Sequence, residues 1–171
     1  MITRSYTAEK WPFLAAGASF LILCGAWFFQ YGLGYAPCAL CLDQRHIHWA
    51  IIGIGLVTGG VMGWRPGLRQ YAPYICFVLL GGFLYSAGFA GWHAGIEYGW
   101  WEGPASCTTT GDVDVSLNDL NAVLGGTGAP IVLCDEAAWT LFGISMAGYN
   151  AILSTLLAGM SVAAAFRKPH G

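Results

Sequence analysis

The chain has 171 residues, of which 56% are apolar and only 9% are charged, and its net charge is −2. Ordinary soluble domains carry about 25% charged residues, so this composition excludes a soluble domain. No nucleotide-binding glycine motif is present, and no nucleic-acid partner is expected. The apolar residues gather in runs of about 20, the length that a helix needs to cross the hydrocarbon layer. We therefore predict an all-α membrane protein, a four-helix transmembrane bundle that forms a single domain over residues 1–171.

The four predicted spans cover about residues 11–30, 46–62, 71–90 and 139–166. The first run is longer than the apolar part of a usual signal peptide, and no A-x-A cleavage site follows it. We therefore expect it to remain as a membrane span. The connecting segments outside the cytoplasm are then a short loop over about residues 31–44 and a long loop over about residues 91–138.

The charges are distributed unevenly between the two faces of the predicted membrane. Apart from Arg45, the basic residues fall at the N-terminus, after the second span and at the C-terminus, namely Arg4, Lys10, Arg65, Arg69, Arg167 and Lys168. By the positive-inside rule, both termini then lie in the cytoplasm. The two cysteine-containing loops then lie outside the cytoplasm; in a bacterium this compartment is the periplasm, where disulfides persist. For a bacterium, this pattern predicts a multi-pass protein of the inner membrane.

The short external loop carries the motif P-C-A-L-C, with Cys38 and Cys41, and Arg45 follows four residues later. Asp43 is the expected N-cap of the second helix, so the helix dipole and Arg45 should both favour a Cys41 thiolate. A passive disulfide and a zinc site are the alternatives. Zinc usually takes four ligands, and the nearby histidines lie within the helix rather than the loop, so no metal is expected. The spacing and the compartment favour redox chemistry.

The long external loop begins after a segment rich in aromatic residues, which is typical of the membrane interface. His93 lies in this segment and is expected near the outer membrane surface. Further along, residues 116–124 read S-L-N-D-L-N-A-V-L, with Ser116 as N-cap and four apolar residues on one face. This pattern predicts a short helix that lies on the bilayer.

Two more cysteines, Cys107 and Cys134, lie in the long loop, and a bond between them would close about 27 residues. Such a bond could act as a structural staple. The loop has few residues able to form a core, however, so a role in disulfide exchange is favoured. Cys134 is expected just before a helix start, with Asp135 as the cap. Cys24 and Cys76 lie in the middle of apolar runs and read as small hydrophobic residues.

Other functions remain open from the residues alone. A b-type haem could take His93 with His46 or His48 as axial ligands, although water or headgroups are the favoured partners of the last two. A membrane disulfide reductase would favour a redox pair within the spans, whereas Cys24 and Cys76 are each alone there. A third alternative is a scaffold whose disulfides only brace the external loops.

Two segments, P-C-A-L-C-L-D-Q-R at residues 37–45 and C-D-E-A-A-W-T-L-F-G-I-S-M-A-G-Y-N at residues 134–150, resemble the DsbB family of disulfide bond formation proteins. The resemblance covers essentially the whole chain. It implies a four-span inner-membrane enzyme that reoxidises a periplasmic thioredoxin-like thiol oxidase (DsbA-like) and passes the electrons to quinone, either ubiquinone or menaquinone.

The resemblance also implies roles for particular residues. Cys38 and Cys41 would be the pair that faces the quinone, with Cys41 in contact with the ring and Arg45 as its stabilising cation. His93 would lie near the quinone. Cys107 would be attacked by the partner's thiolate, and Cys134 would then pass the electrons to Cys38.

Overall fold

The structure, a computed structural model, describes residues 8–104 and 134–167. Four long helices run along the bundle: α1 (Trp11–Trp27), α2 (Ala39–Trp64), α3 (Ala72–Glu97) and α5 (Met146–Phe166). A π-helical turn, η2 (Phe28–Gly32), extends α1, and a 3-10 turn, η3 (Pro66–Tyr71), joins α2 to α3. Two short antiparallel strands, β1 (Thr140–Leu141) and β2 (Ile144–Ser145), precede α5.

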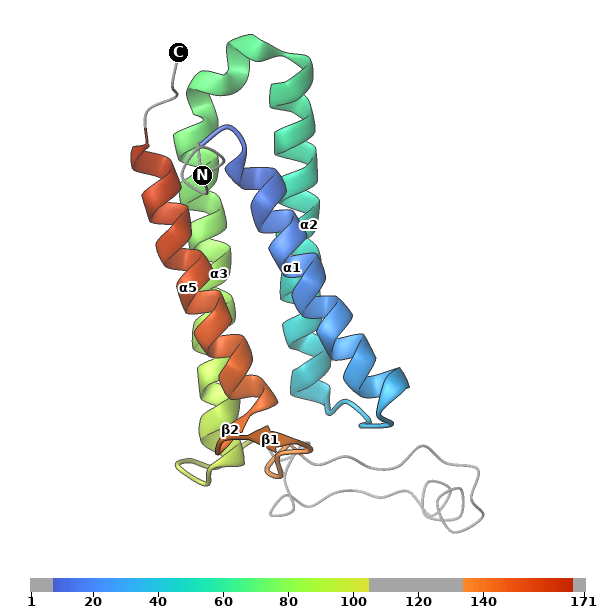
Figure 1. Cartoon of the computed structure of the whole chain (residues 1–171). Helices are drawn as coiled ribbons and strands as arrows, with labels where there is room; N and C mark the ends of the chain where they lie inside the picture. Colours follow the sequence, from blue (N-terminus) through green and yellow to red (C-terminus); the bar gives the residue numbers. More distant parts are fainter. Residues whose placement is uncertain (1–7, 105–133, 168–171) are drawn as a thin grey trace.

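All four helices are long and apolar enough to cross a membrane, which confirms the predicted transmembrane bundle. The start of α1, the α2–α3 connection and the end of α5 lie at one end of the bundle (Figure 1). The segment before α2 and the β1–β2 hairpin lie at the other end. The protein is therefore a multi-pass membrane protein. The predicted interfacial helix and Cys107 lie outside the described residues.

The helices pack in two close pairs, α1 with α2 and α3 with α5, and α2 also contacts α3. Gly55 permits the close approach of α1 and α2, because a Cβ at this position would collide with the carbonyl oxygen of Pro12. Few contacts join α1 to α5. One of them is the hydrogen bond from Trp11 Nε1 to Ser161 Oγ, 2.9 Å long. The bundle is therefore least tightly closed between α1 and α5.

The second helix begins at Ala39, seven residues before the predicted start of its span, so the assignment of Asp43 as N-cap is wrong. Cys38 is the N-cap, and its sulfur accepts the backbone N–H of Cys41 at 3.3 Å. No helix breaker separates Pro37 from the apolar run, so the helix extends outward to the first group that can cap it. Both cysteines of the motif are thereby fixed by the first turn of α2.

The last helix begins at Met146 rather than near residue 139, because the intervening residues form the β1–β2 hairpin. The hairpin turn contains Gly143 with a φ of 77°, a conformation that favours glycine and ends any regular helix. Ser145 is the N-cap of α5 and accepts the N–H of Gly148 at 3.1 Å. The predictions that Cys134 immediately precedes a helix and that Asp135 caps it are therefore wrong.

Candidate functional site

Cys38 and Cys41 form a closely spaced thiol pair at the start of α2. Cys38 donates its S–H to the sulfur of Cys41, and the two Sγ atoms are 2.8 Å apart. This hydrogen bond, together with burial, raises the pKa of the Cys38 thiol above its ordinary range. The arrangement leaves the proton on Cys38 and makes the sulfur of Cys41 the acceptor. The pair is thus differentiated: the outer cysteine carries the proton, and the one inside the helix is ready to react as an anion.

Cys134 also belongs to this end of the bundle. Its side chain is 1% exposed and packs in one apolar cluster with Cys38, Leu40 and Ile96. The structure therefore brings together three of the four cysteines predicted for the site, from segments almost 100 residues apart in the chain. The fourth, Cys107, lies outside the described residues. Cys134 and Cys38 are therefore neighbours at this end of the bundle.

Arg45 lies one turn after Cys41 and points toward α1. Its guanidinium donates hydrogen bonds to the side-chain carbonyl of Gln30 in η2 and to the backbone carbonyl of Ala26, the latter at 3.4 Å. These bonds hold the charge inside the bundle rather than at the headgroups. Neither acceptor was expected from the sequence. Arg45 is therefore an anchored cation on the same helix face as Cys41.

A cavity of about 530 Å³ lies between α1, α2 and α5, and we call it the lipid-facing cavity. Its polar wall is a stripe on α2 at helical spacing, made of Cys41, Gln44, Arg45 and His48. The remaining walls are mostly apolar residues of α1 and α5. Two of them, Leu21 and Leu156, are 71% and 59% exposed on the outside of the bundle, so the cavity opens toward the lipid. This volume is that of a small-molecule site.

A chain of side-chain hydrogen bonds links the thiol pair to the polar wall. His93 Nε2 is 3.6 Å from Cys38 Sγ, and His93 Nδ1 is 2.8 Å from Gln44 Nε2. Asn150 on α5 donates to Gln44 Oε1 at 2.7 Å, and its own Oδ1 is 2.9 Å from His48 Nε2. His93 was predicted for the site, whereas Gln44, His48 and Asn150 were not.

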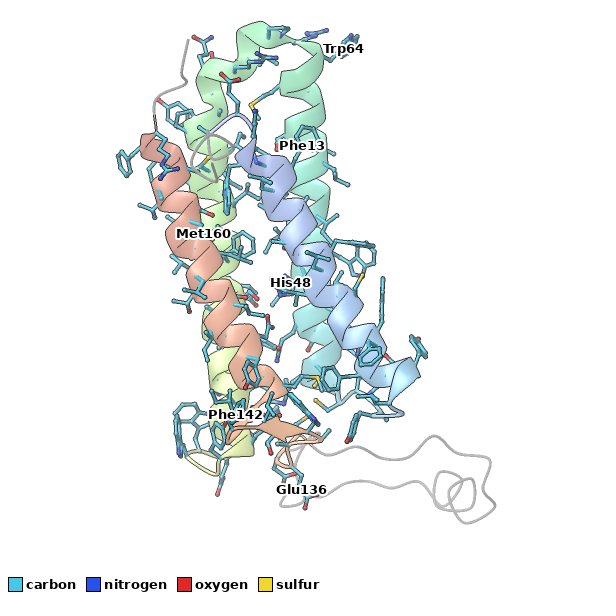
Figure 2. The ribbon with its side chains drawn as sticks, in the orientation of Figure 1. Phe13, His48, Trp64, Glu136, Phe142 and Met160 are labelled. Carbon is cyan, nitrogen blue, oxygen red and sulfur yellow. The ribbon has the colours of Figure 1, made fainter. Side chains whose placement is uncertain are left out.

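This network of hydrogen bonds continues deeper into the bundle through three buried serines. Ser19 lies 3.3 Å from His48 Nδ1, and Ser86 lies 3.5 Å from His48 Nε2. Ser154 is 3.0 Å from Ser86 and donates a hydrogen bond to Asn150 Oδ1 at 3.3 Å. His48 lies about halfway along the bundle, well away from Glu136 at the thiol end (Figure 2). Polar groups at this depth in a membrane are costly and usually functional. We therefore count this network as part of the candidate site.

The interpretation of His48 as an interfacial residue is wrong, because its ring is 1% exposed. His46 is exposed and lies 3.9 Å from Asp43. The rings of His48 and His93 do not share a cavity: His48 lines the lipid-facing cavity, and His93 contacts Cys38 and Gln44. The three histidines within the described residues therefore form no facing pair of axial ligands for a haem.

The ligand atoms of Cys38, Cys41 and His93 lie within 4.8 Å of one another. Among the described residues this is the only such cluster. It offers three ligands, one fewer than structural zinc usually takes.

A family model described as "Disulfide bond formation protein DsbB" matches residues 8–164. The chain belongs to the DsbB family. A relative named disulfide bond formation protein B 2 from Pseudomonas syringae pv. syringae is 30% identical over 85% of this chain and 81% of its own length. Disulfide bond formation protein B from Aromatoleum aromaticum is 26% identical over 84% of each chain, and its namesake from Methylococcus capsulatus is 31% identical over 73% and 74%. No solved structure matches significantly.

Membership in the DsbB family gives the thiol cluster its general role. The protein is a membrane disulfide oxidoreductase of the family that forms disulfide bonds. The resemblance noted from the two cysteine segments is therefore confirmed, and the fold is the helical membrane bundle that it implied.

Proposed function

We propose that this DsbB-family protein reoxidises a thioredoxin-like, DsbA-like thiol oxidase and transfers the electron pair to a membrane quinone. One observation carries the proposal. Cys41 and Arg45 line a cavity that opens toward lipid. Cys38 is hydrogen-bonded to the sulfur of Cys41 and packs in one cluster with Cys134. Electrons can thus enter on the side of Cys134 and leave on the side of Cys41.

The sulfur exchange follows from this order. The partner's thiolate attacks Cys107 in a disulfide with Cys134 and releases the Cys134 thiolate. Cys134 then attacks Cys38 in the Cys38–Cys41 disulfide, which forms a Cys134–Cys38 bond and frees Cys41 as a thiolate beside Arg45. The partner's second thiol completes its own disulfide and restores Cys107 as a thiol, so that two electrons have passed to this chain. Cys107 then attacks Cys134 in the Cys134–Cys38 bond, which restores the Cys107–Cys134 disulfide and releases Cys38 as a thiol that keeps the proton of Cys107.

The acceptor is proposed to be a quinone, ubiquinone or menaquinone, bound as a substrate in the lipid-facing cavity. Its apolar walls suit a ring with a hydrocarbon tail, and the polar wall offers donors for carbonyl oxygens from Arg45 and the amides of Gln44 and Asn150. An oxidase with a potential near that of DsbA, about −120 mV, requires an acceptor of higher potential. When bound, the quinone accepts two electrons from the Cys38–Cys41 pair, together with two protons, as the disulfide of this pair re-forms.

The orientation is part of the proposal. The thiol end of the bundle is placed in the periplasm of a bacterial inner membrane, and both chain termini are placed in the cytoplasm. The distribution of basic residues supports this orientation. A water-soluble partner then reaches the cysteine loops from the oxidising compartment.

The test is quinone-dependent oxidation of a reduced thioredoxin-like oxidase by the purified protein, with short-tail ubiquinone and menaquinone analogues. Wild type should produce quinol and oxidised partner in equal amounts. Cys41→Ser should abolish quinone reduction, whereas Cys24→Ser, which changes a cysteine outside the site, should leave it intact. No turnover with either quinone would contradict the proposal. Catalytic oxidation of the partner retained in Cys41→Ser would also contradict it and would leave the Cys38–Cys41 pair a purely structural role.

A further inference from the structure

Glu97 is a buried carboxylate next to the thiol pair. It is the last residue of α3, and its side chain is 6% exposed. Its Oε1 lies 3.9 Å from His93 Nε2, and its Oε2 has no hydrogen-bond partner among the described residues. An oxygen that is buried without a partner costs free energy, so its presence at a reactive site calls for an explanation.

Glu97 shares a second, smaller cavity with the reacting sulfurs. This cavity has a volume of about 30 Å³ and is lined by both Cys38 and Cys41. That volume is enough for one or two water molecules, which could bridge a thiol to a carboxylate. The charged and titratable groups around it are Tyr35 from the segment before α2, Cys38, Cys41 and Arg45 at the start of α2, Glu97 on α3 and Glu136 from the segment before β1. His93 adjoins it through Cys38 and Glu97.

The disulfide between Cys38 and Cys41 can form only if Cys38 loses its proton. The S–H of Cys38 is the hydrogen bond donor to Cys41, and the proposed reaction joins these two sulfurs. Two electrons then leave with the quinone, and the proton of Cys38 must pass to a base. The neighbouring candidates are His93 and Glu97.

The hydrogen bonds of His93 argue against the imidazole as that base. Asn150 donates to Gln44 Oε1, so Gln44 presents its N–H to His93 Nδ1. The neutral ring therefore carries its own proton on Nε2, the nitrogen that faces Cys38. A protonated nitrogen can stabilise negative charge on sulfur but cannot accept a further proton.

We propose that Glu97 accepts the proton of Cys38 when the Cys38–Cys41 disulfide closes. This inference rests on the proposed redox role of the pair. The S–S bond forms, the S–H bond of Cys38 breaks, the electron pair goes to the quinone, and the proton goes to the Glu97 carboxylate through the small cavity. Gln44 and Asn150 are positioning residues, since they fix the proton of His93 on the side of the sulfur.

If Glu97 acted only through its charge, its removal would have the opposite effect on the rate at which the Cys38–Cys41 disulfide closes. A negative charge near the pair disfavours a thiolate, so its removal should increase the reactivity of Cys41 and accelerate every step that follows. Loss of a base should instead slow closure of the disulfide, even though Cys41 reacts as fast as before or faster. The two roles are therefore separated by measuring alkylation and closure in the same variant.

The experiment compares Glu97→Gln with wild type in full-length protein that also carries Cys107→Ser and Cys134→Ser, so that only the Cys38–Cys41 pair can close. Alkylation of Cys41 by iodoacetamide should be unchanged or faster. Closure in a single turnover with a short-tail ubiquinone should slow by about 100-fold, the usual contribution of a general base. Glu97→Asp should restore part of the rate. Glu102→Gln removes an exposed carboxylate that does not line this cavity and should close like wild type.

A second oxidant separates failure of this inference from failure of the proposed function. Oxidised glutathione forms a mixed disulfide with Cys41, and closure by Cys38 then requires the same loss of a proton without any quinone. Glu97→Gln should slow this closure as well. Closure at the wild-type rate or faster with both oxidants would overturn the role of Glu97. A wild-type protein that closes with glutathione but never with quinone would overturn the proposed function instead.

Discussion

Asn150 on α5 donates a hydrogen bond to Gln44 on α2 at 2.7 Å, inside the hydrophobic part of the bundle. The two helices otherwise belong to different packed pairs, so this bond joins them where the lipid-facing cavity begins. Both amides also contact a histidine, His48 on one side and His93 on the other. A single pair of amide side chains therefore contacts both rings and helps to hold them in place.

Replacement of Asn150 by leucine should destabilise the bundle. Leucine has a similar volume but removes the hydrogen bonds that Asn150 makes with Gln44 and His48, in a medium that offers no substitute. A buried polar group left unpaired costs about 1–3 kcal/mol in the free energy of unfolding. The measurement is unfolding in detergent micelles. Thr155→Ala is the control, because this exposed hydroxyl bonds only its own helix, and an equal loss in both variants would contradict the network.

The two thiols of the motif should differ in their dependence on pH. The raised pKa of Cys38 keeps it protonated above the range where an ordinary thiol ionises, near pH 8.5. The hydrogen bond to Cys41 is the main cause, so Cys41→Ala should lower the pKa of Cys38. Alkylation of Cys38 at pH 9 should then rise by about tenfold for each unit of pKa lost. Mass spectrometry of reduced protein alkylated from pH 7 to 10 checks this, and identical Cys38 profiles in both proteins would contradict it.

A substitution that removes both the charge and the hydrogen bonds of Arg45 should lower quinone turnover more than one that keeps the charge. Arg45→Met leaves Gln30 without its donor and Cys41 without its cation. A hydrogen bond to a charged group contributes about 1.5–3 kcal/mol, so quinone turnover should fall by about 10-fold to 100-fold. Arg45→Lys should show a smaller loss. Arg65→Met, at the opposite end of the bundle beside Trp64, is the control, and equal rates for Arg45→Met and wild type would refute this role.

A bulky residue in the lipid-facing cavity should block the acceptor and spare the sulfur exchange. Leu153 lines the cavity, and Leu153→Trp should fill much of it. Quinone reduction should then fall at least about tenfold, while a stoichiometric exchange of disulfides with the partner continues. Ile152→Trp, on the neighbouring exposed position of α5 that does not line the cavity, is the matched control. Equal effects of the two tryptophans would show that the cavity is not the acceptor site.

Local spacing made part of the site predictable. The apolar runs predict the four helices, and the interval from Cys41 to Arg45 is one helical turn, so both residues must lie on one face. The polar stripe of Gln44 and His48 continues the same spacing and could have been found in the same way. Taken alone, His48 reads as an interfacial residue, and only the shared spacing links it to Cys41 and Gln44.

Contacts between distant segments were beyond such reasoning. Nothing in the sequence near Asn150 specifies Gln44 as its partner, and the packing of Cys134 against Cys38 depends on the hairpin before α5. The helix starts were also misplaced, because a cysteine sulfur caps α2 and Ser145 caps α5 after the hairpin. The position of the caps, rather than hydropathy, decides where the reactive sulfurs lie relative to the membrane.

The sparse contact between α1 and α5 determines how a molecule dissolved in the bilayer can reach the lipid-facing cavity. A long-chain molecule that enters between these helices can leave its tail among the acyl chains while only its head reaches Cys41. Arrival and departure then require lateral diffusion alone, with neither passage through water nor separation of the tightly packed helix pairs. In the proposed cycle, the pairs α1–α2 and α3–α5 can therefore stay packed while a lipid-soluble acceptor is exchanged.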